Sequence, residues 1–88
     1  MTDQEQKEIK ALEPAEAVAR LDIYLKENPK DTDALTLRGM RHWSLGHRAE
    51  AINDYLAAIR INPESRAREA LKAANEILDY RNKDLYNP

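Results

Sequence analysis

The chain repeats itself at an interval of 34 residues, and this period limits the folds it can adopt more than any other feature. Shifting the sequence by 34 positions places Ala15-Glu16-Ala17 on Ala49-Glu50-Ala51, Val18 on Ile52, Leu21 on Tyr55, Leu25 on Ile59, and Asn28-Pro29 on Asn62-Pro63. A period of this length accommodates one helix–turn–helix unit, which cannot bury its apolar side alone and must stack on a neighbour. The sequence therefore predicts a stack of paired helices.

Apolar spacing and capping signals predict five helices in an all-α chain. Thr2 and Glu5 have the spacing of a capping box, Pro14 suits a first helical position, and Gly46 suits the left-handed residue after a helix. The expected helices cover about 2–11, 14–27, 33–45, 48–61 and 65–82, with Asp31 or Thr32 capping the third and Ser65 capping the fifth. Only two glycines and 34 % charged residues agree with helices rather than sheets.

Residues 32–63 resemble a tetratricopeptide repeat. The matching slots are filled by Leu35, Gly39, Gly46, Ala51, Tyr55, Ala58 and Pro63, whereas Arg38 and His42 replace the family's usual leucine and tyrosine. The resemblance implies a right-handed α-solenoid of antiparallel helix pairs. It also implies one domain, 1–88, made of a partial first repeat (1–29), a full repeat (32–63), a C-terminal capping helix (65–82) and a tail (83–88), in which Leu85 and Tyr86 could fold back on the stack.

The same resemblance implies a protein–protein interaction module, such as an adaptor or scaffold, that binds a peptide or protein segment through its concave face. The first helix of each repeat lines that face in the family, and the corresponding positions here are Asp33, Thr36, Leu37, Met40, Trp43 and Ser44. Trp and Met are frequent binding anchors. Trp43 and Met40 could equally pack against another helix of the chain.

The sequence gives no sign of an enzyme, a metal site or a cofactor. Metal-binding histidines on one helix usually stand four residues apart, whereas His42 and His47 stand five apart, and the chain has no cysteine. Acidic residues such as Asp31 and Asp33 stand at helix starts, where negative charge favours the helix dipole. We therefore expect no catalytic, cofactor-binding or metal-binding residue.

Two alternative functions remain open. Exposed apolar residues could be buried in a self-assembled homodimer, and the Arg38, Arg41 and Arg48 cluster could contact nucleic acid. The net charge of −2 argues against nucleic acid, because binding of its phosphates demands a basic face. The polar N-terminus lacks the apolar segment of a secretory signal, so we expect a cytoplasmic chain that is a monomer or a homodimer without a membrane partner.

Overall fold

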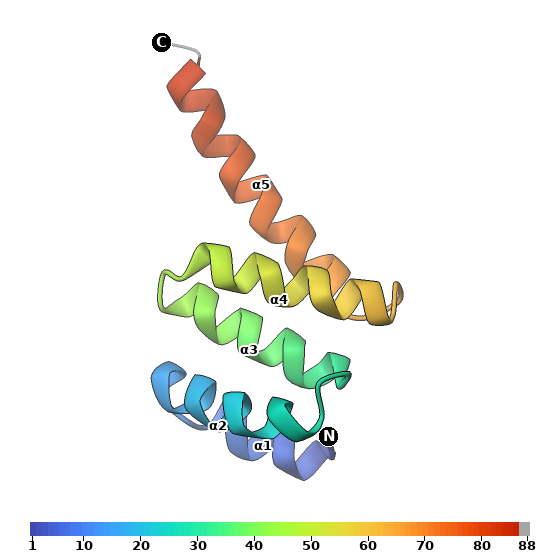
Figure 1. Cartoon of the computed structure of the whole chain (residues 1–88). Coiled ribbons are helices and arrows are strands. Elements are labelled where there is room, and N and C mark those ends of the chain that lie inside the picture. The colour runs from blue at the N-terminus through green and yellow to red at the C-terminus, as the bar shows by residue number, and fades with distance from the viewer. Residues whose placement is uncertain (87–88) are drawn as a thin grey trace.

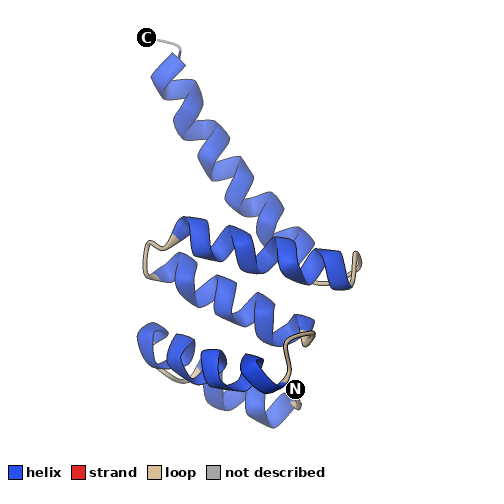
Figure 2. Cartoon of the chain, viewed as in Figure 1, coloured by secondary structure: helices blue, strands red, loops and turns tan. Residues whose placement is uncertain are grey.

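The chain is all-helical in the computed structural model, which describes the backbone of residues 1–86 and the side chains of residues 1–77. Within residues 1–86 there are five helices and no strand (Figures 1 and 2): α1 (Asp3–Lys10), α2 (Pro14–Glu27), α3 (Thr32–Ser44), α4 (Arg48–Ile61) and α5 (Ala67–Tyr86). The predicted fold class is confirmed at this level. The bounds of α2 and α4 agree with the sequence prediction at both ends.

The predicted capping signals explain where α1, α2 and α3 begin. Thr2 and Glu5 form a reciprocal capping box at α1, and Pro14 is the first residue of α2. Asp31 Oδ1 accepts a hydrogen bond from the backbone N–H of Ala34 at 3.1 Å, so Asp31 rather than Thr32 caps α3. These contacts satisfy backbone N–H groups that have no partner inside the helix.

The fifth helix differs from its prediction at both ends. It begins at Ala67 instead of Ser65, and within the described side chains the buried Ser65 hydroxyl has no hydrogen-bond partner, so the expected Ser65 cap is wrong. The helix also continues to Tyr86, so residues 83–86 of the expected tail are helical. The side chains of Leu85 and Tyr86, which were expected to fold back, lie outside the described residues, as do residues 87 and 88.

Successive helices run in alternating directions and pack side by side, with α3 at the centre (Figure 1). Helix α3 contacts α2, α4 and α5, whereas α1 packs on α2. The far half of α5 projects beyond the other helices (Figure 1). The core draws on every helix. Among the side chains of residues 1–77 it includes Ile9, Ala17, Leu21, Leu25, Ala34, Leu35, Leu37, Ala51, Tyr55, Ala58, Ala67 and Ala74.

A very close approach joins α3 to α4 at Gly39. A β-carbon built on Gly39 would stand 2.6 Å from Cε1 of Tyr55 and 3.1 Å from the backbone oxygen of Ala51. The Tyr55 ring is 3 % exposed and fills the space that a side chain at position 39 would need. Glycine at this position is therefore a packing requirement rather than a source of flexibility.

Arg38, which departs from the repeat pattern, binds carboxylates on the two helices beside α3. Its Nε and Nη2 donate to Asp54 of α4 at 2.9 and 2.8 Å, and its Nη1 donates to Asp22 of α2 at 2.9 Å. The paired hydrogen bonds to Asp54 suit the planar guanidinium. Asp54 is buried, so this arginine supplies the charge that keeps an ionised carboxylate stable there.

Asp31, in the α2–α3 loop, is hydrogen-bonded to the start of the chain and to α2. Its Oδ2 accepts hydrogen bonds from the Met1 amino group at 2.8 Å and from the Tyr24 hydroxyl at 2.6 Å. Burial alone would raise the pKa of Asp31, but the hydrogen bonds from Met1, Tyr24 and the Ala34 backbone, with the charge of the amino group, together outweigh burial and lower the pKa. The hydrogen bond that the Tyr24 hydroxyl donates to Asp31 is the main cause that raises the pKa of Tyr24 to about 12.

We expect Gly39→Ala to lower the free energy of unfolding by about 1–2 kcal/mol, because its methyl group collides with a buried ring and backbone. The higher helix propensity of alanine offsets part of this loss. Gly46→Asn is the control, because Gly46 has φ +81° with no atom near a built β-carbon, and asparagine tolerates that backbone. Urea denaturation measures both, and a Gly39→Ala protein more stable than the parent would contradict the close packing.

We expect Arg38→Leu to cost about 2–3 kcal/mol of unfolding free energy, because it leaves Asp54 buried without its counter-charge. Arg38→Leu combined with Asp54→Ala should recover much of that loss. Asp22→Asn should cost less than about 1 kcal/mol, because the Asp22 side chain is half exposed. Equal losses in Arg38→Leu and the double variant, measured by urea denaturation, would show that the charge of Asp54 is not the cause.

Candidate functional site

One side of α3 lines two adjoining pockets. Residues three and four apart share a helix face, and Asp33, Thr36, Leu37, Met40, Trp43 and Ser44 follow that spacing. Ala34, Leu35 and Gly39 belong instead to the packed sides of the helix, and Thr36 and Leu37, although they line a pocket, are themselves only 6 % and 4 % exposed. Helix α3 thus serves both the core and an accessible surface.

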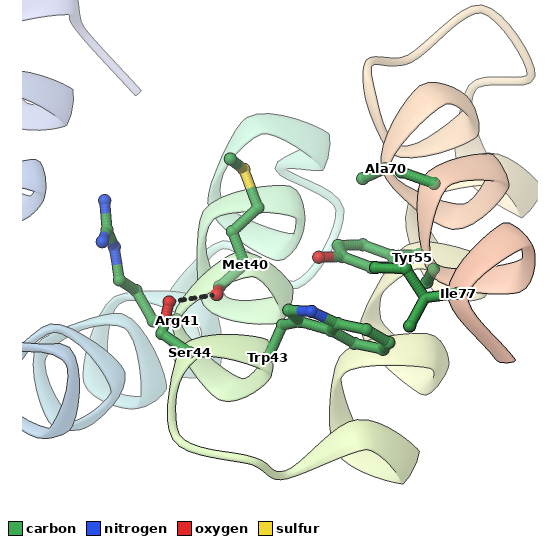
Figure 3. Close-up of a pocket in the computed structure, with 9 residues that line it drawn as sticks. Met40, Arg41, Trp43, Ser44, Tyr55, Ala70 and Ile77 are labelled. Atoms are coloured by element: carbon green, nitrogen blue, oxygen red, sulfur yellow. Dashed lines mark hydrogen bonds between the residues drawn. The ribbon is translucent and has the colours of Figure 1, made fainter. Parts of the chain in front are cut away.

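The first pocket, here called the Trp43 pocket, lies between α3, α4 and α5 and has a volume of about 310 Å³. Figure 3 shows the rings of Trp43 and Tyr55 lying toward Ile77 of α5, while the Arg41 side chain points away from these apolar groups. Its lining among the described side chains is Met40, Arg41, Trp43, Ser44, Tyr55, Ala70, Ala73, Ala74 and Ile77. The pocket therefore has a mostly apolar wall with two aromatic rings.

The second pocket, here called the Leu37 pocket, has a volume of about 350 Å³ and lies between α1, α3 and the start of α5. Leu37, Met40 and Ala70 provide its apolar surface. Charged residues of both signs, with one amide and one hydroxyl group, complete the lining: Gln6, Lys10, Asp33, Thr36, Arg66 and Glu69. Volumes of this size are typical of small binding sites that combine an apolar surface with a few polar groups.

Met40 and Ala70 line both pockets, so the two pockets adjoin along α3. Met40 is 45 % exposed and stands where the pockets meet. An unbranched thioether adapts to differently shaped ligands more readily than a branched side chain does. We call the combined surface the α3 groove.

Most hydroxyl groups of the groove are already engaged within the chain. Thr36 donates to the backbone oxygen of Thr32 at 2.8 Å, and Ser44 donates to that of Met40 at 3.2 Å (Figure 3). Burial, with a smaller effect of the Asp54 charge, raises the pKa of Tyr55, so its hydroxyl stays protonated.

Among the described side chains, the buried Nε of Arg41 has no hydrogen-bond partner. This nitrogen has almost no exposed surface and the Arg41 side chain points away from the apolar wall of the pocket (Figure 3), so it is not offered to a ligand in the groove.

Trp43 both packs within the chain and lines the groove. It is partly buried against the core, and the guanidinium carbon of Arg48 lies 5.2 Å from the centre of its ring. That distance suits a cation–π contact. Packing within the chain and a place in the binding surface, the two interpretations of Trp43 drawn from the sequence, are therefore compatible.

All six residues predicted from α3 line the α3 groove, but the sequence missed the residues from other helices. Tyr55, Ala70, Ala73, Lys10 and Gln6 carry no signal of their own, because their positions depend on where α1 and α5 cross α3. Ile77 of α5 is 44 % exposed and lines the Trp43 pocket, where α5 projects beyond α4 (Figure 1).

The three clustered arginines do not form a free basic surface. Arg38 is bound to two carboxylates, Arg48 lies over Trp43, and Arg41 lines the Trp43 pocket with a buried Nε. Nucleic acid binding needs guanidinium groups that can release counterions from phosphates. The arrangement therefore disfavours the nucleic-acid alternative.

The turn between α3 and α4 brings His42 and His47 together, although their spacing argued against a shared site. Their Nδ1 atoms are 3.2 Å apart, and Glu50 of α4 approaches His47 at 3.8 Å. The argument from the spacing was wrong because it holds for a single continuous helix, whereas these residues flank a turn.

The chain matches no protein-family model, no curated protein sequence and no solved structure. The tetratricopeptide resemblance consequently rests on the repeat residues alone. Within the described part of the chain, no helix combines the length and apolar character needed to cross a membrane.

Proposed function

We propose that the chain is a protein–protein interaction module of tetratricopeptide type that binds a peptide segment in the α3 groove. In this proposal the helices form a short right-handed solenoid of antiparallel pairs, and the groove is its concave face. The observation that supports the proposal most is that two largely apolar pockets adjoin along α3, with Met40 and Ala70 in the lining of both.

The composition of the groove favours a ligand segment with bulky apolar side chains. Trp43, Tyr55 and Ile77 offer an apolar wall for one such side chain, while Met40 and Leu37 offer a surface for the next. Lys10 and Arg66 favour carbonyl or carboxylate oxygens on the ligand. Such a ligand would bind mainly through a few buried anchors, as most peptide interfaces do.

We propose a binding role without catalysis. The carboxylates of the groove, Asp33 and Glu69, belong to the pocket that also holds the cations Lys10 and Arg66. The proposal places the protein in the cytoplasm as an adaptor or scaffold.

Self-association is a second candidate because several large apolar side chains are exposed outside the groove. Ile23 on α2 is 67 % exposed, and Leu56 and Ile61 on α4 are 41 % and 42 % exposed. A homodimer would bury such residues and add to the small core of a chain of this length. Light scattering over a wide concentration range tests this, and a monomeric mass throughout would reject it.

We expect peptides selected from a displayed random library to bind the α3 groove and to be enriched in bulky apolar residues. Met40→Ala should weaken their binding about tenfold and Trp43→Ala about thirtyfold or more, because anchor truncation commonly costs about 1–2 kcal/mol or above. Fluorescence anisotropy with labelled peptides measures the dissociation constants.

Ile23→Ala is the matched control, because Ile23 is more exposed than Met40 and lines neither pocket of the groove. Circular dichroism confirms that each variant keeps its helices. Selected peptides that lose affinity on Ile23→Ala but not on Met40→Ala would move the binding surface from α3 to α2 and contradict the proposal.

A further inference from the structure

We propose that His42, His47 and Glu50 form a binding site for a divalent transition-metal ion, with zinc as the representative ion. The three side chains come from the end of α3, the residue before α4 and the first turn of α4. One ligand atom from each lies within 4.8 Å of the others. This site is separate from the α3 groove and does not depend on the proposed function.

The turn between α3 and α4 fixes the two histidines relative to each other. The backbone N–H of His47 donates to the carbonyl of His42 at 2.8 Å, and that of Gly46 donates to Trp43 at 3.0 Å. With Gly46 in the left-handed conformation, this is the Schellman arrangement of a helix end. That motif commonly places the side chains at the positions of His42 and His47 in contact, and here the contact joins two imidazoles.

The distance between the two Nδ1 atoms matches the distance between two nitrogens that bind the same zinc ion. Two nitrogens bound to zinc at about 2.05 Å and at a tetrahedral angle stand about 3.3 Å apart. The two Nδ1 atoms are 3.2 Å apart, and the ring planes are tilted by 44° rather than stacked. Each ring would turn the lone pair of its Nδ1 toward a common point to bind an ion, and the separation of the two nitrogens already matches that of two ligands of one zinc.

Glu50 completes a set of three protein ligands. Its Oε2 lies 3.8 Å from Nδ1 of His47, somewhat farther than two ligands of one ion, and its side chain is 54 % exposed and free to rotate inward. Two imidazoles with one carboxylate suit zinc and the neighbouring ions cobalt, nickel and copper rather than magnesium or calcium. Water would occupy the remaining position of the ion, because the side chains of His47 and Glu50 are about half exposed.

A bound ion would connect α3 to α4 at the end of their shared turn. Because its ligands meet only when that turn is formed, the ion would bind the folded chain in preference to the unfolded chain. A molecule or ion that binds only the folded state raises the unfolding temperature. Zinc should therefore stabilise the protein as well as bind to it.

The test is isothermal titration calorimetry of the full chain with zinc chloride at neutral pH, together with thermal unfolding. We expect one zinc per chain, a raised unfolding temperature, and an affinity at least about tenfold weaker in His42→Gln, His47→Asn or Glu50→Gln, since loss of even an outer partner of a metal ligand commonly costs that much. Asparagine at position 47 keeps a residue that favours helix starts.

Glu16→Gln is the matched control, because Glu16 occupies the repeat position equivalent to Glu50, is exposed in the first turn of α2, and has no histidine near it in the sequence. Nitrogen chemical shifts of the imidazole rings provide a second readout, in which zinc should move the Nδ1 signals of both histidines. Absence of binding heat and of ring shifts would overturn the proposal and leave a hydrogen-bonded histidine pair. Equal weakening by Glu16→Gln and Glu50→Gln, or coordination by Nε2 alone, would overturn it as well.

Discussion

The missing side chain of Gly39 allows α3 and α4 to lie close enough for the Tyr55 ring to enter the space between them. This contact fixes the position of α3, which in turn contacts α2, α4 and α5. Apolar burial supplies most of the driving force for such packing, but it does not by itself select one arrangement of helices. The arrangement of α3 against α4 is selected by three small residues and one large ring: Gly39, Ala51, Ala58 and Tyr55.

Electrostatic contacts supplement this packing at positions where the chain departs from the repeat pattern. Arg38 replaces an expected apolar residue and binds carboxylates on both neighbouring helices, so α2, α3 and α4 are joined by one guanidinium. Asp31 performs a comparable task at the α2–α3 loop, where it caps α3 and holds Tyr24 and the Met1 amino group. A small helical stack with few large apolar residues gains specificity from such bonds, because each fixes both distance and direction.

The helices could be predicted closely from the sequence, because their ends depend on local signals. Pro14, Asn28, Gly46 and Pro63 act within one turn of the helix that they begin or end, and the two copies of the repeat reinforce each other. The start of α5 could not be predicted in the same way. Ser65 is a favourable cap by type, but its hydroxyl is buried without a described partner, and the helix begins at Ala67.

The candidate site was predictable only where it lies on one helix. The six residues of α3 share a face by spacing, so the sequence placed all of them together. Tyr55, Ala70 and Lys10 depend on helix crossings, and no spacing rule connects them to Met40. The histidine pair is a different case, because a signal was present: His42 and His47 flank a glycine in the positions that a Schellman turn brings together.

Hydrogen exchange of the backbone amides, followed residue by residue under native conditions, tests most directly whether α3 organises the fold. If it does, the amides in the middle of α3 around Gly39 exchange last and at the rate set by global unfolding, together with those of α4 that face them. The amides of α1 exchange earlier, because α1 reaches α3 mainly through α2. Amides of α3 that exchange as fast as those of α1 would show that the stack does not depend on this helix.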